Sequence, residues 1–306
     1  MQTTIKSQIA FEGVGLHSGK PARMVIHPAS AEHGIWFKRG DIHVGDALVP
    51  ARWDVVNQTP LCTRIENGRG VSVSTIEHIM AALVGCGVHN ALIEIDGPEV
   101  PILDGSAATF VRGILARGIV RLASPVRAIE VLRKIEVKKG DAWARLEPGE
   151  GLTIDFRIEF DDKAIGAQRK QLNMSNGSFV RELCDSRTFC RQADVDAMRE
   201  QGLALGGTLE NAVVVDGDKV LSPGGLRHDD EAVRHKMLDA LGDLALAGAP
   251  IIGAYTGHKA GHALTNDLLR KLFSTPGAFR MVVCDDRTAA RLPGAGVHVG
   301  EIPAVA

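Results

Sequence analysis

Three side chains at four-residue spacing, His235, Asp239 and Asp243, could do chemistry together if they share a helix. Residues four apart in a helix lie on one face, one turn above another. A histidine and a carboxylate one turn apart can converge on one metal ion, and Asp243 is then placed to hold a partner group. A solvated polar face is the competing interpretation, because this spacing also arises by chance.

The adjacent pair Glu77-His78 could contribute to the same kind of centre. Neighbouring helical residues point about 100° apart. A metal on His78 would therefore leave Glu77 beside the open coordination position, where it could take a proton from water. The alternative is a capping box between Ser74 and Glu77 at the start of the helix. The two interpretations compete, because one carboxylate does not readily serve both purposes.

A third histidine, His262, is expected in a loop before a helix, and loops on rigid scaffolds often carry catalytic groups. In its protonated form it could donate to a leaving amine; the alternative is an ordinary surface histidine. Lys236 and Lys259 flank these positions and could meet phosphate oxygens, or could be solvated surface lysines. The other histidines lie in no comparable constellation: His17, His27, His33, His43, His89, His228, His258 and His298.

The elements that must position these residues follow from periodicity and from turn signals. The helix predicted over 75–84 carries Glu77, and the helix predicted over 230–247 has an apolar stripe at helical spacing. Residues 152–160 alternate apolar and polar side chains, the pattern of a half-buried strand. The further predicted elements are strands 4–11, 22–27, 34–38, 90–95, 128–137, 142–146 and 251–255, helices 107–117 and 263–273, and a helix-and-hairpin region 192–220.

Both halves of the chain therefore follow the order strands, helix, strand, helix. This order predicts an α+β fold of two related domains that face each other. The stretch 121–127 contains Ser124-Pro125 and is the predicted linker. We expect one domain over residues 1–124, with Glu77 and His78, and another over residues 125–306, with His235, Asp239 and His262.

The composition limits the class of protein. Lys and Arg number 35 against 37 Asp and Glu, and aromatic residues are only 4%, so the basic surface and stacking groups of a nucleic-acid binder are not expected. The five cysteines include no Cys-x-x-Cys pair, which argues against disulfides and against a thiolate zinc site. No signal core or membrane-spanning stretch is expected, so the sequence predicts a soluble, cytoplasmic protein.

Several long blocks together resemble the UDP-3-O-acyl-N-acetylglucosamine deacetylase family, nearly end to end. They are TIKSQIAFEGVGLHSGKPARMVIHPA, STIEHIMAALVGCGVHNALIEIDGPEVPILDGSA, SRTF, RHKMLDALGDLAL and GHKAGHALTN. The resemblance implies a two-domain α+β enzyme in which each domain is a small sheet layered with helices and the active site lies between the domains. It would remove the acetyl group from UDP-3-O-acyl-N-acetylglucosamine, the committed step of lipid A synthesis in Gram-negative bacteria, with Zn²⁺ as cofactor.

The resemblance also implies a role for individual residues. The zinc ligands would be His78, His235 and Asp239. Glu77 would be the general base, and His262, oriented by Asp243, the general acid. The remaining implied roles are oxyanion stabilisation by Thr188, an acyl passage bordered by Phe189 and the 193–205 segment, uridine contacts from Glu159 and Phe160, and diphosphate contacts from Lys236 and Lys259.

Other interpretations stay open on the sequence. A different zinc hydrolase, such as a peptidase, would share the metal site, and a catalytically silent binding protein would share the nucleotide-sugar pocket. Zinc or iron(II) would suit two histidines and one carboxylate. The sequence does not specify the acyl-chain length, the oligomeric state or regulation by proteolysis, and a lipid substrate could bring the protein to a membrane surface.

Overall fold

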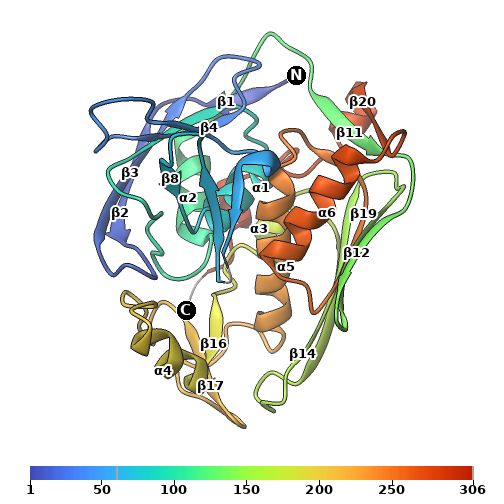
Figure 1. The fold of residues 1–306 in the computed structure, drawn as a ribbon. Helices are drawn as coiled ribbons and strands as arrows, with labels where there is room; N and C mark the ends of the chain where they lie inside the picture. Colours follow the sequence, from blue (N-terminus) through green and yellow to red (C-terminus); the bar gives the residue numbers. More distant parts are fainter. Residues whose placement is uncertain (60, 305–306) are drawn as a thin grey trace.

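The computed structural model describes residues 1–59 and 61–304. It is a mixed α+β fold in which each half of the chain forms small sheets layered with helices, as predicted (Figure 1). The two halves lie side by side, and buried apolar side chains from both form one continuous cluster. The site described below is built where the two halves meet.

The first half contributes short strands and two helices. Its elements are β1 (Thr3–Ile5), β2 (Ile9–Val14), β3 (Pro21–Pro28), β4 (Ile35–Arg39), β5 (Leu48–Pro50), the 3-10 turn η1 (Trp53–Val55), β6 (Val56–Gln58), β7 (Thr63–Glu66), β8 (Ser72–Val73), α1 (Glu77–Gly85), β9 (Ala91–Ile95), α2 (Ala108–Arg117) and β10 (Ile119–Arg121). The main sheet has the order β2-β3-β9-β4-β5. In β3 the buried residues Ala22, Met24 and Ile26 alternate with more exposed ones, so one face of the strand packs on the core.

The second half has a larger sheet and the longest helix. Its elements are β11 (Arg127–Val131), β12 (Ile135–Lys139), β13 (Ala142–Glu147), β14 (Leu152–Glu159), β15 (Ala167–Asn173), α3 (Ser178–Glu182), β16 (Phe189–Arg191), α4 (Gln192–Glu200), β17 (Val213–Asp216), β18 (Lys219–Val220), α5 (Glu231–Ala245), β19 (Ile251–His258), α6 (His262–Ser274), β20 (Phe279–Val283), α7 (Asp286–Ala289) and the 3-10 turn η2 (Val299–Glu301). β19 is central, because it pairs with β11, β13 and β14.

The long predicted helices are confirmed to within two residues at each end, and β14 has the predicted alternation of buried and exposed side chains. Two predicted strands are each divided. Residues 4–11 fall into β1, which pairs with β10, and β2, which pairs with β3. Residues 128–137 fall into β11, which pairs with β19 and β20, and β12, which pairs with β13. In both places the two pieces bond to different strands, so the backbone must turn between them.

Most elements absent from the prediction are short or polar, although the apolar strand β20 (FRMVV) was missed as well. β15 has the sequence AQRKQLN and buries none of its side chains fully, so it carries no apolar signal. β5 to β8 are two to four residues long and lie between turns. Residues 122–126, inside the predicted linker, connect β10 to β11. The domain division at residue 124 stays a prediction.

The five cysteines are free, and three of them are buried. Among residues 1–59 and 61–304, no helix is both long and apolar enough to cross a bilayer.

α1 and α5 pack against each other at the centre of the molecule (Figure 1). Gly242 of α5 lies directly on the backbone of Glu77, the first residue of α1. A Cβ atom at position 242 would be 2.1 Å from the Glu77 carbonyl oxygen, far inside contact distance. The missing side chain of Gly242 therefore sets how closely the two helices approach.

We expect Gly242→Ala to destabilise the protein, although Gly→Ala in an exposed helix usually stabilises by up to about 1 kcal/mol. The added methyl group must displace the backbone of α1, and overpacking of this kind costs about 1–3 kcal/mol. The measurement is the free energy of unfolding in denaturant. Gly68→Ala is the matched control, because a Cβ atom there meets nothing within 4 Å. Equal stability of the two variants would contradict the close-packing argument.

Candidate active site

The first turns of α1 and the middle of α5 bring three potential metal ligands together. His78 lies on α1, and His235 and Asp239 lie one turn apart on α5. Their ligand atoms are all within 4.8 Å of one another, and all three side chains are buried. The His78 Nε2 atom is 3.7 Å, and the His235 Nε2 atom 3.3 Å, from Asp239 Oδ1. The structure therefore brings together the three residues whose types and spacing suggested a metal centre.

The protonation states of this cluster suit a cation. The Nδ1 atom of His235 is 3.0 Å from the carbonyl oxygen of Ser186, so Nδ1 carries the proton and the Nε2 lone pair faces the cluster. Burial and the neighbouring His235 lower the pKa of His78 to about 3, and burial also lowers the pKa of His235. Burial alone would raise the pKa of Asp239, but His235 and Lys236 outweigh it and hold that pKa below the usual range. Two neutral imidazoles thus face an ionised carboxylate.

One atom of the cluster is left without a hydrogen-bond partner. Asp239 Oδ1 is buried and accepts no hydrogen bond, whereas Oδ2 accepts one from Lys236 Nζ at 2.8 Å. A buried carboxylate oxygen without a donor is costly. A metal ion at this point would satisfy it, and two nitrogens with one oxygen are a donor set that zinc accepts. The residues present therefore fit a divalent ion.

The predicted capping box at Ser74 and Glu77 is wrong. α1 begins at Glu77, and no side chain caps it. Ser74 instead donates to the carbonyl oxygen of Pro98, and the backbone turns at Thr75 with φ 58°. The Glu77 carboxylate points into the site, where its Oε2 accepts from the Thr63 N–H at 3.0 Å and its Oε1 lies 3.9 Å from His262 Nε2. Burial raises the pKa of Glu77 to about 8.

His262 is the first residue of α6 rather than a loop residue, and its ring is held by Asp243. The His262 Nδ1 atom is 2.9 Å from Asp243 Oδ2, so Nε2 is the ring nitrogen turned toward Glu77. Asp243 Oδ1 accepts a second hydrogen bond from the Thr63 hydroxyl at 2.5 Å. Burial would lower the pKa of His262, but Asp243, Glu77 and Asp239 together raise it to about 10.

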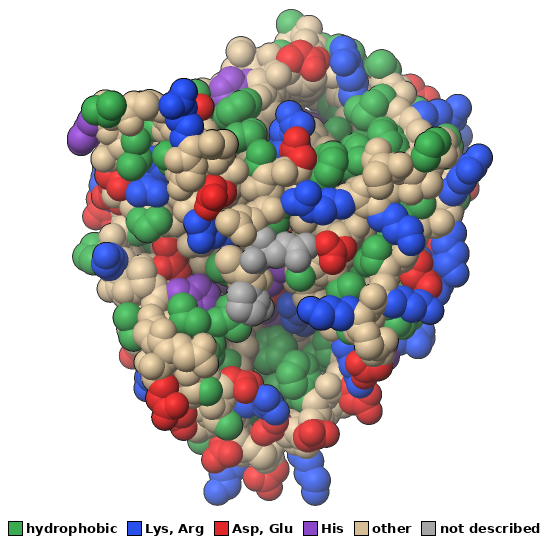
Figure 2. Space-filling model, viewed as in Figure 1, with side chains coloured by type: hydrophobic (Ala, Val, Ile, Leu, Met, Phe, Trp, Pro, Cys, Tyr) green, Lys and Arg blue, Asp and Glu red, His purple; other side chains and the backbone are tan. Residues whose placement is uncertain are grey.

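A cavity of about 840 Å³ opens from this cluster. Thr188, Phe189 and Phe160 line it together with His235 and His262. The ring of Phe189 meets His235 edge to face at 6.2 Å, and Phe160 at 5.5 Å. The rest of the wall comes mainly from α4 and the segment after it, and includes Val195, Ala197, Met198, Leu203 and Ala204. Figure 2 shows this face of the molecule hollowed, with hydrophobic side chains inside the hollow.

Comparison with known proteins decides the family. A sequence model of the family described as UDP-3-O-acyl N-acetylglycosamine deacetylase matches residues 2–274, most of the chain. The chain belongs to this deacetylase family.

Curated members of the deacetylase family match along almost their whole length. The UDP-3-O-acyl-N-acetylglucosamine deacetylase of Phenylobacterium zucineum is 48% identical over 280 residues, which covers 92% of this chain and 96% of that protein. The enzymes of the same name from Anaeromyxobacter sp. strain Fw109-5 and Shewanella frigidimarina are 45% and 42% identical. They cover 95% and 97% of this chain, and 95% and 99% of their own lengths.

Of the residues that the resemblance to deacetylases suggested for the nucleotide, some line the cavity and others do not. Lys236 lines the cavity, but its ammonium group is bound to Asp239. Lys259 pairs with Glu159 at 2.8 Å and with Asp141 at 2.9 Å. Neither Lys259 nor Glu159 is among the residues that line the cavity. The structure therefore joins Lys259 to Glu159 but does not bring either to the cavity wall.

Two further residues of the site were absent from the sequence-based candidates. Thr63 of β7 binds Glu77 through its N–H and Asp243 through its hydroxyl, yet nothing in a short polar strand signals this. His17 lines the cavity, and both its ring nitrogens are buried without a hydrogen-bond partner. Its place in the opening block GVGLHSG was the only available signal.

We expect Asp243→Asn to lower the pKa of His262 from about 10. An opposite charge in direct contact shifts a pKa by about 1–3 units, and the amide removes that charge while keeping an acceptor for Nδ1–H. The measurement is an NMR titration of the His262 ring in the metal-free deacetylase. Asp155→Asn is the control, because Asp155 pairs with the exposed Arg169 instead. An unchanged His262 titration in Asp243→Asn would show that Asp243 does not hold the proton on the ring.

Proposed function

We propose that this chain is a zinc-dependent deacetylase that hydrolyses the acetamide of UDP-3-O-acyl-N-acetylglucosamine. The products would be acetate and UDP-3-O-acyl-glucosamine, at the committed step of lipid A synthesis in the cytoplasm. The observation that carries the proposal is the partnerless buried oxygen of Asp239, which lies beside two neutral imidazoles and within reach of a carboxylate and a cationic histidine. The names of the relatives, which specify UDP-3-O-acyl-N-acetylglucosamine, support the substrate.

Zinc would be held by His78, His235 and Asp239, which leaves a fourth position for water or substrate. When bound, zinc supplies a Lewis acid that polarises the amide carbonyl and makes water more acidic. Iron(II) accepts the same donor set. Lys236 helps to keep Asp239 ionised and in place, because it occupies the second carboxylate oxygen.

Glu77 would be the general base. Its Oε2 is fixed by the Thr63 N–H, while Oε1 faces the interior of the site. A carboxylate held in this way can take a proton from the attacking water. Because Glu77 does not cap its helix, the structural role that competed with this interpretation is absent. This also weakens the interpretation as a silent binding protein, which a capping Glu77 would have favoured.

His262 would be the general acid. Asp243 accepts the Nδ1–H of the ring, so the Nε2–H is free to point at the substrate. The high pKa of His262 keeps the ring cationic at neutral pH. It can then stabilise negative charge on the carbonyl oxygen and give its proton to the departing nitrogen, which could not leave as an anion.

The cavity would orient the rest of the substrate. Thr188 would donate to the developing oxyanion, and Phe189 with the apolar wall of the cavity would receive the acyl chain. Phe160 and Glu159 remain candidates for uridine contacts. For Lys236 and Lys259 to bind the diphosphate, its oxygens would have to compete with the carboxylates that now hold these ammonium groups.

The function is tested by acetate release from the acylated UDP-N-acetylglucosamine, with zinc content measured on the same samples. We expect Glu77→Ala and His262→Ala each to lose about 100–10,000-fold in kcat, the usual contribution of a general acid or base, with zinc retained. His78→Ala should lose the metal. Glu12→Ala is the control, because Glu12 is an exposed partner of Arg23. Near-normal turnover by Glu77→Ala would exclude the base role, and a parent that releases no acetate would exclude the function.

The dependence of kcat/KM on pH should be bell-shaped. Without metal, the pKa of Glu77 is about 8 and that of His262 about 10, so the base ionises before the acid loses its proton. A bound dication favours the carboxylate and disfavours the imidazolium, so it moves both pKa values down. Activity should therefore fall at low pH, where Glu77 is protonated, and at high pH, where His262 is neutral. A profile without an alkaline limb would contradict the acid role of His262.

A further inference from the structure

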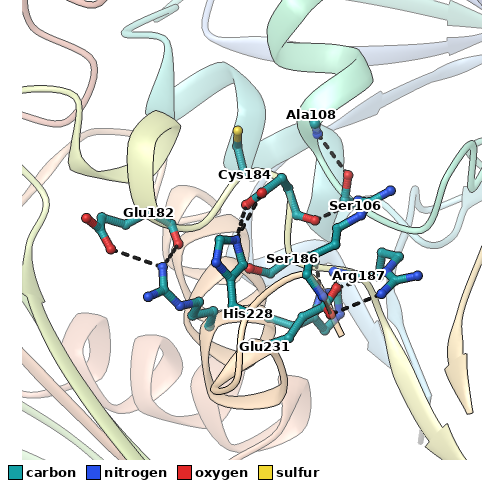
Figure 3. A network of polar contacts seen from close by, with 12 residues as sticks. Ser106, Ala108, Glu182, Cys184, Ser186, Arg187, His228 and Glu231 are labelled. Carbon is teal, nitrogen blue, oxygen red and sulfur yellow. Dashed lines mark hydrogen bonds and ion pairs between the residues drawn. The ribbon is translucent and has the colours of Figure 1, made fainter. Parts of the chain in front are cut away.

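The segment 182–188, which leads into the cavity wall, is clamped to residues 225–234 by polar contacts (Figure 3). Arg234 donates to the carbonyl oxygen of Glu182 at 2.7 Å, and Arg227 donates to the carbonyl oxygen of Asp185 at 2.7 Å. His228 Nε2 lies 2.9 Å from the Asp185 carboxylate. Groups on and just before α5 thus hold the backbone of this segment at several points.

The most buried contact in the clamp is the pair Arg187–Glu231. Glu231 is 1% and Arg187 6% exposed. Glu231 Oε1 accepts from the Arg187 N–H and Nε, both at 2.9 Å, and Oε2 accepts from Arg187 Nη2 at 3.1 Å and from the Arg227 N–H at 2.7 Å. Arg187 Nη2 also donates to the Gly225 carbonyl oxygen at 2.7 Å. Both the backbone and the side chain of Arg187 are therefore bound to one carboxylate.

This pair lies between two functional positions. Glu231 is one helical turn before His235, so it extends the face that carries His235 and Asp239. The residue before Arg187 is Ser186, whose carbonyl oxygen accepts the Nδ1–H of His235. The residue after it is Thr188, which lines the cavity and whose N–H donates to the carbonyl oxygen of Gly105. The backbone around Arg187 therefore sets the orientation of the His235 ring and the position of Thr188, the proposed oxyanion donor.

We propose that Arg187 and Glu231 are positioning residues for the deacetylation reaction. The pair fixes the Ser186 carbonyl oxygen that orients His235, and it places Thr188 in register with the metal ligands on α5. The inference rests on the proposed metal and oxyanion roles of His235 and Thr188. It adds an ion pair that touches neither metal nor substrate and acts only through the 186–188 backbone.

A role in positioning differs in its consequences from a role in stability. Replacing a buried ion pair by apolar residues of similar size often leaves the fold as stable as before, whereas removing one partner leaves a buried charge. The double variant Arg187→Met with Glu231→Leu therefore keeps a packed interior. It removes the acceptor of the Arg187 N–H, so the 186–188 backbone is no longer tied to α5. Loss of an outer partner of a metal-binding histidine typically weakens metal affinity or activity by about 10–100-fold.

The experiment measures three properties of the zinc-loaded parent and of the double variant. They are the thermal unfolding midpoint, the zinc dissociation constant by chelator competition, and kcat and KM for acetate release at saturating zinc. We expect a lower midpoint, because the backbone N–H groups of positions 187 and 227 lose their acceptor. We also expect zinc affinity weaker by about 10–100-fold, and kcat lower by about 100-fold with KM little changed, because a small misplacement of catalytic groups acts on kcat. A folded double variant with parent-like zinc affinity and kcat would overturn the proposal.

A single variant provides a second test in case the double variant does not fold. Glu231→Gln keeps the shape of the side chain but turns an amide donor toward the donors of Arg187 or Arg227, and it should weaken zinc affinity in the same direction. Glu130→Gln is the matched control, because Glu130 forms an exposed pair with Arg280 at 2.6 Å. Equal zinc affinity of these two variants would count against positioning. If the parent released no acetate, the proposed function would fail, and the zinc dissociation constants alone would decide the role of the pair.

Discussion

The close approach of α1 and α5 is the constraint on which the rest of the site depends. Gly242 lets the backbone of α5 lie against Glu77, and this contact carries His78 to within reach of His235 and Asp239. Neither helix holds a complete ligand set. The candidate metal centre forms because two helices from different halves of the chain share one buried interface, and the proposed acid and base are attached to the same two helices or to the elements packed on them.

That interface concentrates titratable groups where water cannot screen them. Burial keeps the imidazoles of His78 and His235 neutral and raises the pKa of Glu77, while three carboxylates hold a proton on His262. These pKa shifts suit the hydrolysis of an amide. The two histidines are neutral and can bind a cation, and the pKa of the proposed base lies below that of the proposed acid. Glu231 binds Arg187 beside the Ser186 carbonyl oxygen that accepts from His235, and Thr63 binds both Glu77 and Asp243.

Much of this could be predicted from the sequence, because helical spacing alone determines that His235, Asp239 and Asp243 share a face. Long helices and the alternating strand β14 were likewise predictable from periodicity. What could not be predicted depends on contacts between distant segments. The left-handed turn at Thr75 decides that Glu77 enters the site rather than capping its helix, and Thr63 reaches the site from a strand without any apolar pattern.

The proposed chemistry requires one metal ion between the two helices. Anomalous diffraction from crystals grown with zinc, recorded on both sides of the zinc absorption edge, tests it most directly. We expect a single strong peak among His78, His235 and Asp239, at about 2.0–2.2 Å from the Nε2 atoms and the carboxylate oxygen. A zinc-loaded crystal with no anomalous peak there, or with its peak bound to other side chains, would contradict it.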